Sequence, residues 1–245
     1  MSGSPDDRCR AASRARSDCD SPRTPSSSTD RSATPIDTAD IAAQLACCTP
    51  GQDGRGQRVQ LALFRLLAEG DPVEPARLAT HAGVPVSEVA DLLGRWWGVH
   101  TEEGRVVAFR GLSVREAPHR LEVDGRTLYT WCAWDTLFLP ELIGRPAAIE
   151  STCPVTGAPV SLRVGSGGPV GLSPPEAVLS FIRPGGSFGD DVIQSFCRFV
   201  HFFASPDAAA TWTDGHPGTF VISIEQGFEI GRRTNAAQWG DVLRS

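Results

Sequence analysis

The sequence predicts an α+β protein, with a winged-helix-like helical subdomain followed by a mainly antiparallel sheet domain with flanking helices. Apolar residues recur at helical spacing between residues 57 and 97, and a tight Gly83-Val84-Pro85 turn precedes the last of these helices. Short alternating segments follow, and Asp124-Gly125 between two of them is a strong two-residue hairpin signal. A closing helix is expected at residues 236–243.

The composition divides the chain into a tail at 1–38, the helical subdomain at 39–117 and the sheet domain at 118–245. Residues 1–38 are mainly Ser, Arg, Asp, Thr and Pro, with scarcely a large apolar side chain before Ile36. Such a segment buries too little apolar surface to offset its ordering entropy, so we expect disorder. Cys9 and Cys19 are then exposed and incidental.

The helical subdomain begins with a short helix at residues 36–48, for which Asp37 or Thr38 is a suitable cap. The adjacent thiols Cys47 and Cys48 can bind a soft metal, but the following Thr-Pro-Gly loop favours an ordinary surface position. Three further helices are predicted, and Ser87 is the expected cap of the last. They cover residues 57–70, 74–82 and 87–97.

Two predicted strands, at residues 105–110 and 111–114, complete the winged-helix order, which raises the question of DNA binding. A recognition helix usually presents basic or amide side chains to phosphates and bases. The candidate helix instead carries two acidic side chains, Glu88 and Asp91, and only one basic side chain, Arg95. We therefore expect this subdomain to pack on the rest of the protein and not to bind nucleic acid.

Alternating apolar and polar residues predict the strands of the sheet domain. They are expected at residues 120–123, 126–129, 147–151, 159–164, 177–182 and 219–224. Residues 191–204 favour a helix, because Val192, Phe196, Phe199 and Phe203 keep helical spacing. Their aromatic content leaves a strand open.

Charge and cysteine usage narrow the class of protein. A net charge of -6 and a pI near 5.4 argue against a general nucleic-acid binder or an anionic-membrane binder. No apolar run is long enough to span a bilayer and the N-terminus lacks a signal-peptide pattern, so we expect a cytoplasmic protein. Seven irregularly spaced cysteines favour reduced thiols over a disulfide framework.

The apolar run at residues 129–140 carries two reactive groups, Cys132 and Asp135. If the run is helical up to Pro140, these side chains lie on one face and can touch, whereas in a strand they point to opposite sides. Cys197 lies in a similar apolar setting, and Cys153 is a third candidate thiol. A lone buried thiol is usually inert, but an acid in so apolar a run needs a partner or a purpose.

Four blocks of the sequence together resemble the alkylmercury lyase (organomercurial lyase) family in order and spacing. They are residues 128–137, 140–145, 156–162 and 194–205, and the likeness extends over about residues 55 to 240. The resemblance implies an enzyme of mercury detoxification, which cleaves the carbon–mercury bond by protonolysis and releases a hydrocarbon and Hg(II).

The resemblance also implies roles for single residues. Cys132 and Cys197 match the two mercury-binding cysteines of the family, and Asp135 matches its proton-handling aspartate. Cys153 matches a family cysteine with a structural role. One departure is that Arg198 follows Cys197, where some relatives have another cysteine, and this leaves the route of Hg(II) handover in question.

The residues themselves suggest how such a reaction proceeds. Two soft thiolates on one mercury make the attached carbon more basic, and a proton donor must lie within reach of that carbon. We expect Cys132 and Asp135 to share one proton until the metal displaces it and Asp135 passes it to carbon. Apolar neighbours are expected to raise the carboxyl pKa and exclude water. They are Trp131, Trp134, Phe138, Phe196 and Phe199.

We expect no organic cofactor, because no phosphate-cradling loop or dinucleotide motif is present. The resemblance implies low-molecular-weight thiols as co-reactants and a mercuric reductase as the acceptor of Hg(II). Two alternatives remain: a thiol-based metal-sensing regulator of winged-helix type, and a non-catalytic soft-metal carrier in which Asp135 has no role. A cysteine hydrolase with Cys197 as nucleophile and His201 as base lacks an oxyanion element and an orienting acid.

Overall fold

The computed structural model describes residues 36–49, 51–189 and 191–243. The predicted disordered tail, with Cys9 and Cys19, therefore lies almost entirely outside the described residues. Within them, none of the helices is both long and apolar enough to cross a membrane.

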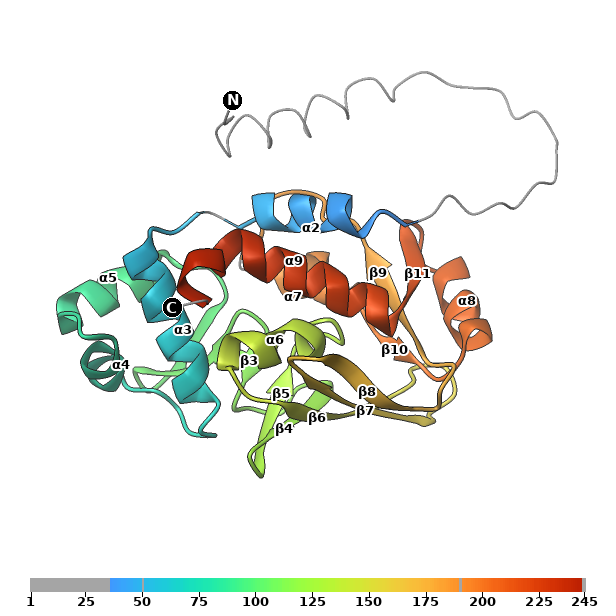
Figure 1. Cartoon of the computed structure of the whole chain (residues 1–245), viewed down its shortest axis with the longest axis horizontal. Helices are drawn as coiled ribbons and strands as arrows, with labels where there is room; N and C mark the ends of the chain where they lie inside the picture. The colour runs from blue at the N-terminus through green and yellow to red at the C-terminus, as the bar shows by residue number, and fades with distance from the viewer. Residues whose placement is uncertain (1–35, 50, 190, 244–245) are drawn as a thin grey trace, which may run out of the picture.

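Two antiparallel sheets form the β part of the molecule (Figure 1). The larger has eight strands in the order β1-β2-β3-β5-β4-β6-β7-β8, and the smaller has the order β10-β9-β11. The strands of the large sheet are β1 Val99–Glu102, β2 Arg105–Phe109, β3 Leu112–Ser113, β4 His119–Val123, β5 Arg126–Thr130, β6 Ala147–Thr152, β7 Pro159–Gly165 and β8 Gly168–Ser173. Those of the small sheet are β9 Val178–Ile182, β10 Phe202–Phe203 and β11 Thr219–Ser223.

Helices precede, connect and follow the strands, so the predicted α+β class is confirmed. They are α2 Thr38–Cys47, α3 Gly54–Leu67, α4 Pro75–Ala82, α5 Val86–Arg95, α6 Asp135–Ile143, α7 Val192–Ser195, the 3₁₀ turn η2 Cys197–Phe199, α8 Pro206–Asp214 and α9 Ile224–Leu243. In Figure 1, α2 and α9 run side by side along one face, and α6 lies between α9 and the large sheet.

The predicted hairpin is present and leads the chain into the first thiol segment. Val123 of β4 pairs with Arg126 of β5, so the turn contains only Asp124 and Gly125. Both turn residues have positive φ, 48° and 76°, as a type I′ turn requires. Because the turn sets the register of both strands, it also fixes where β5 delivers the chain after Thr130.

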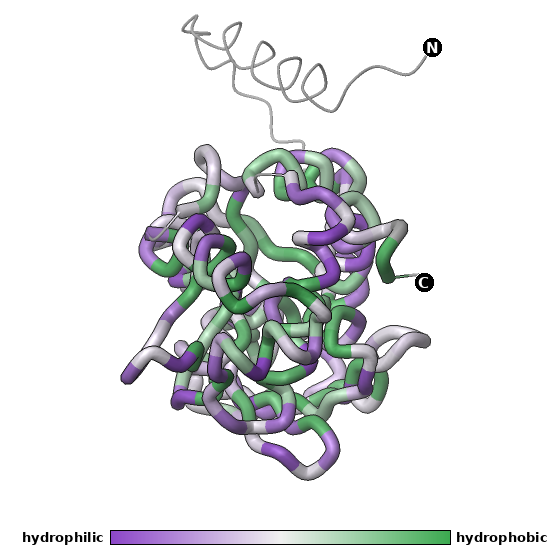
Figure 2. Tube along the Cα trace, turned by 90° about the vertical axis from the view of Figure 1, so that its left-hand side faces the viewer, coloured by the Kyte–Doolittle hydropathy of each residue, from purple (hydrophilic) through white to green (hydrophobic). Residues whose placement is uncertain are grey.

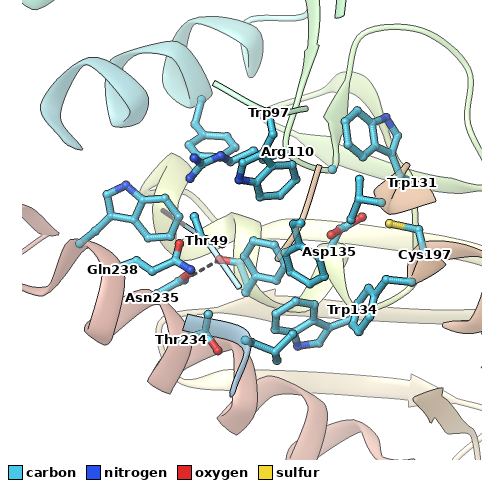
Figure 3. Close-up of a pocket in the computed structure, with 18 residues that line it drawn as sticks. Thr49, Trp97, Arg110, Trp131, Trp134, Asp135, Cys197, Thr234, Asn235 and Gln238 are labelled. Atoms are coloured by element: carbon cyan, nitrogen blue, oxygen red, sulfur yellow. Dashed lines mark hydrogen bonds between the residues drawn. The ribbon is translucent and has the colours of Figure 1, made fainter. Parts of the chain in front are cut away.

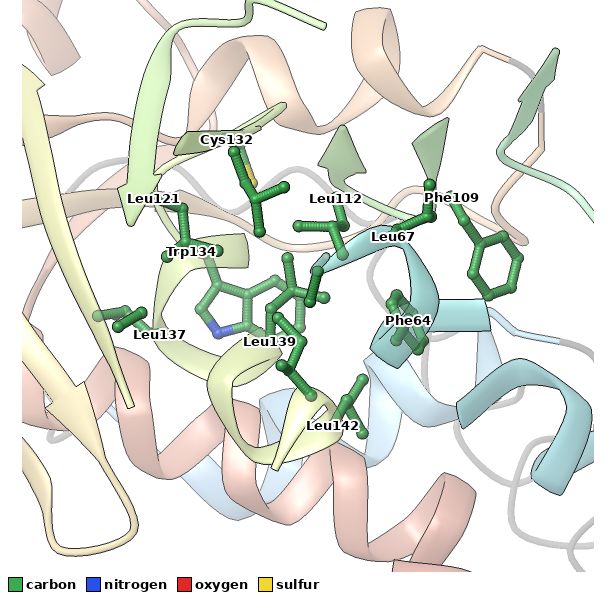
Figure 4. Close-up of a cluster of buried hydrophobic side chains, with 14 of the residues drawn as sticks. Phe64, Leu67, Phe109, Leu112, Leu121, Cys132, Trp134, Leu137, Leu139 and Leu142 are labelled. Carbon is green, nitrogen blue, oxygen red and sulfur yellow. The ribbon is translucent and has the colours of Figure 1, made fainter. Parts of the chain in front are cut away.

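A continuous core joins α3, the large sheet and α6 (Figure 4). Phe64 and Leu67 of α3 face the α6 side chains Leu139 and Leu142, and all four are almost fully buried. Coloured by hydropathy, the trace alternates between hydrophobic and hydrophilic segments, and the hydrophilic colour is frequent in protruding loops (Figure 2). This core is the support on which α6 and its N-terminus rest.

Helix α9 approaches α6 closely because two of its residues are glycines. A Cβ on Gly231 would lie 2.6 Å from the Cβ of Phe138, and one on Gly227 would lie 2.9 Å from Leu137. Two polar contacts add to this packing. Trp134 Nε1 donates to the Gly227 carbonyl at 3.0 Å, and Asn235 Nδ2 donates to Glu141 Oε2 at 2.7 Å.

The prediction of a helix at residues 191–204 is wrong. The segment instead contains the short α7, the turn η2 and the strand β10, which pairs with β9. Ser180 of β9 explains the difference, because its hydroxyl donates to the Phe199 carbonyl at 2.8 Å and accepts from the His201 N–H at 2.9 Å. These pairings with β9 compete with the intrahelical hydrogen bonds that the aromatic periodicity suggested.

Other boundaries also differ from the prediction. The closing helix α9 begins at Ile224 and has 20 residues, whereas only residues 236–243 were expected. Strands β1 and β8 and helix α8 were not predicted. The cap of α5 is Pro85, without a side-chain hydrogen bond, so the prediction of Ser87 is wrong.

Candidate active site

Cys132 lies in a tight loop between β5 and α6, not within the helix as the helical reading required. Thr130 Oγ1 donates to the Cys132 carbonyl at 3.0 Å, and the Cys132 N–H donates to Asp135 Oδ2 at 2.8 Å. Asp135 is the first residue of α6, where the helix dipole favours a carboxylate. The predicted proximity of the two residues is therefore present, but a loop that wraps around the N-terminus of α6 produces it.

Three potential ligand atoms, one each from Cys132, Asp135 and Cys197, all lie within 4.8 Å of one another. All three residues are buried, with exposed fractions of 0%, 6% and 5%. Figure 3 shows Asp135 and Cys197 side by side at one end of a pocket. A backbone hydrogen bond from Ala133 N–H to the Val200 carbonyl, at 3.1 Å, holds the two thiol segments together.

Gly111 forms the floor beneath Asp135, a role that the sequence did not reveal. It has a φ of +98°, and a Cβ at this position would lie 2.5 Å from Asp135 Cγ. Its carbonyl accepts from the Trp131 N–H at 3.0 Å, which ties the Cys132 loop to this residue. Only glycine combines this backbone conformation with so close an approach of the carboxyl group.

The buried surroundings change the acidity of both groups of the pair. Burial raises the pKa of Asp135 to about 7, although hydrogen bonds from the N–H and thiol of Cys132 and from the Trp131 N–H lower it. Burial also raises the pKa of the Cys132 thiol well above its usual value, and its hydrogen bond with Cys197 and the negative charge of Asp135 add to this rise. The free pair is thus arranged to retain a proton at neutral pH.

The pocket beside these groups is rich in aromatic side chains, and Asp135 and Cys197 line it, whereas Cys132 does not (Figure 3). Of the predicted apolar neighbours, Trp131, Trp134, Phe138 and Phe196 line it. Phe199 does not, and its ring packs against His216 with centroids 6.4 Å apart. Further lining residues were not predicted from the sequence; they include Phe64, Trp97, Arg110, Phe188, Asn235 and Trp239.

The remaining candidate residues lie elsewhere. Cys153 is buried in a separate small cluster with Phe203, Ala208 and Ala209. His201 Nε2 forms a hydrogen bond with the Arg198 carbonyl at 2.8 Å, which argues against a role as base for Cys197. Of the vicinal cysteines, Cys47 is exposed as predicted, but it is disulfide-bonded, so the prediction of a reduced thiol is wrong for it. The surface position is wrong for Cys48, which is buried.

Soft sulfur ligands beside a buried acid, enclosed by aromatic rings, are the elements of an enzyme that acts on a soft-metal compound. Comparison with known proteins defines that class further. The sequence model described as alkylmercury lyase matches residues 112–235, a range that contains Cys132, Asp135 and Cys197. The chain belongs to the alkylmercury lyase family.

Curated relatives are similar over most of their length. An alkylmercury lyase of Staphylococcus epidermidis is 45% identical over 71% of this chain and 80% of its own. An alkylmercury lyase of Pseudomonas putida is 42% identical over 69% of this chain and 79% of its own. One of Streptomyces lividans is 37% identical over 74% of this chain and 83% of its own. The mercury-bound form of MerB2 has a similar fold, with a TM-score of 0.63 at 22% identity over 82% of this chain and 98% of that one.

Proposed function

We propose that Cys132, Asp135 and Cys197 are the catalytic residues with which this organomercurial lyase cleaves the carbon–mercury bond. The observation that carries the assignment is the convergence of their buried ligand atoms within 4.8 Å, beside an aromatic pocket that Asp135 and Cys197 line. Two thiolates supply electron density to mercury, and the acid supplies a proton to the departing carbon.

The proposed steps begin with Cys132 and Asp135 sharing one proton, and they conserve protons and charge. Cys132 sulfur bonds to mercury and displaces the thiolate that carried the substrate, while the Cys132 proton moves to Asp135. The displaced thiolate takes the proton of Cys197, whose sulfur then becomes the second ligand of mercury. The carbon–mercury bond breaks, its electron pair accepts the proton from Asp135, and Hg(II) stays on the two thiolates.

The same proposal includes the fate of the metal. We propose that low-molecular-weight thiols deliver the substrate and remove Hg(II), that a mercuric reductase accepts the ion in the cytoplasm, and that no organic cofactor takes part. Arg198, next to Cys197, is exposed and contacts Gln194 Oε1 at 3.3 Å. It offers no further sulfur ligand, so an incoming thiol has to capture Hg(II) directly from the catalytic pair.

In the helical region, α3, α4 and α5 precede the β1–β2 pair, and this element order supports a winged-helix-like interpretation. We propose that residues 39–117 are a subdomain of this type that walls the catalytic pocket of residues 118–245. In support, Phe64 and Trp97 line the pocket, and Glu88 of α5 is paired with Arg55 at 2.6 Å. Family membership does not favour the alternative of a DNA-binding metal sensor.

Hydrocarbon release tests the catalytic assignment. We expect the wild-type protein to release methane from methylmercury or benzene from phenylmercury in excess thiol, and Asp135→Asn and Cys197→Ser to lose this activity. Cys153→Ser is the matched control, because it removes a buried thiol outside the pocket, and it should retain activity. If all four proteins bind mercury and none releases hydrocarbon, a soft-metal carrier replaces the lyase assignment.

A further inference from the structure

Arg110 places a buried cation in the wall of the catalytic pocket. It follows β2, directly before Gly111, and only 6% of the residue is exposed. Figure 3 shows its guanidinium group beside Trp97, on the side of the pocket away from Cys197. The proposed reaction assigns no role to this residue.

The guanidinium group has aromatic neighbours but no acidic partner. Its central carbon lies 4.8 Å from the ring centroid of Trp97 and 5.3 Å from that of Phe109. Its Nε is buried and has no hydrogen-bond partner. Among the residues that the structure describes, no carboxylate forms an ion pair with Arg110. The aromatic rings offset only part of the cost of burying a charge.

Asp135 packs against Gly111, the residue after Arg110, but its carboxyl group does not form an ion pair with Arg110. Burial alone lowers the pKa of Arg110 to about 9, so the group keeps its charge at neutral pH. The shifted pKa of Asp135 has causes in burial and in the Cys132 loop, and Arg110 is not among them. The pocket therefore has the acid and the Cys197 thiol at one end and an unpaired cation in its wall.

We propose that Arg110 binds a carboxylate on the organic group of the substrate, so that carboxylated aryl mercurials are preferred over neutral ones. The inference rests on the proposed catalytic site. With mercury on Cys132 and Cys197 and the reacting carbon facing Asp135, the organic group must occupy the aromatic pocket that Arg110 lines. The planar guanidinium fork matches a carboxylate in two parallel hydrogen bonds, which a hydrophobic wall cannot supply.

The test compares kcat/KM for phenylmercury and 4-carboxyphenylmercury, both supplied as adducts of the neutral thiol 2-mercaptoethanol. We expect Arg110→Met to lose roughly 10- to 100-fold on the carboxylated substrate, the usual effect of removing a charged hydrogen bond, and little on phenylmercury. Arg110→Lys should lose less, because it keeps the charge without the fork. Arg163→Met, at an exposed position on β7, is the matched control and should change neither value.

Equal losses on both substrates, or no loss on either, would overturn the role of Arg110. A loss seen only when phenylmercury is supplied on mercaptoacetate would assign the recognised carboxylate to the thiol, and would also overturn it. If Arg110→Met does not fold, the proposal is tested by inhibiting phenylmercury cleavage by the wild-type protein with benzoate and with benzamide. Benzoate should then inhibit phenylmercury cleavage more strongly than benzamide, and equal inhibition rejects the proposal. Failure of the wild-type protein to cleave phenylmercury would instead reject the proposed catalytic function.

Discussion

At the scale of single residues, the site depends on close contacts around the carboxyl group of Asp135. Asp135 is held from one side by the Cys132 N–H at 2.8 Å and from the other by the bare Cα of Gly111. The acid is thereby kept beside the two thiols, and among the described residues no basic side chain forms an ion pair with it that would favour its ionised state. Its elevated pKa is a consequence of that arrangement.

Gly111→Ala should therefore abolish most activity. The added Cβ would lie 2.5 Å from Asp135 Cγ, so the carboxyl group has to move, and a displacement of about 1 Å in a catalytic group can cost about 100-fold in rate. Hydrocarbon release under saturating phenylmercury measures the effect. Gly104→Ala is the control, because Gly104 also has positive φ, +76°, but has nothing within 4 Å of its Cβ position. An equal loss in both variants would mean that backbone strain, not displacement of Asp135, is responsible.

The pKa of Asp135 also predicts how stability depends on pH. Because the pKa rises from 3.8 to about 7 on folding, the folded state binds more protons in that interval, and Asp135 makes the protein less stable as pH increases through it. Asp135→Asn removes this penalty, which amounts to about 1.4 kcal/mol per pKa unit. Urea unfolding at several pH values should therefore show that the free energy of unfolding of the variant, relative to that of the wild type, increases between about pH 4 and 7. A difference that stays constant with pH would contradict the raised pKa.

At the scale of elements, the packing of α9 on α6 determines where the N-terminus of α6 lies. The two helices meet through Gly227 and Gly231, and Asn235 Nδ2 bonds to the Phe138 carbonyl at 3.1 Å. The indole of Trp134, which lines the pocket, is fixed to α9 through the Gly227 carbonyl. Helix α9 is thus a support for the catalytic loop as well as the cover of the core.

Alanine substitutions at two helical glycines separate packing from helix propensity. Gly231→Ala should destabilise the protein by about 1–3 kcal/mol, because its Cβ would lie 2.6 Å from Phe138 Cβ and the interface has to shift. Gly94→Ala in α5 has nothing within 4 Å of its Cβ, so it should stabilise by up to about 1 kcal/mol. Chemical denaturation measures both. Stabilisation by Gly231→Ala would show that the contact between α6 and α9 relaxes without cost.

At the scale of the whole molecule, local signals predicted elements whose hydrogen bonds are local. The Asp124-Gly125 hairpin and the Asp37 cap of α2 are examples, and both are present in the structure. Residues 191–204 were misassigned, because Ser180 on a distant strand decides their conformation. The proximity of Cys132 to Asp135 was predicted from spacing, but the contacts of Gly111 and the position of Arg110 depend on tertiary packing, which spacing does not report.

The aromatic wall of the pocket gives the enzyme an optical property. Of the six tryptophans in the chain, four line the pocket, namely Trp97, Trp131, Trp134 and Trp239. Mercury is a heavy atom, and its spin–orbit coupling diverts an excited indole nearby from fluorescence to the triplet state. An organomercurial that reaches the thiols should therefore dim most of the intrinsic emission, and an incoming thiol that removes Hg(II) should restore it. Each turnover of the unlabelled protein can thus be followed as a cycle of quenching and recovery.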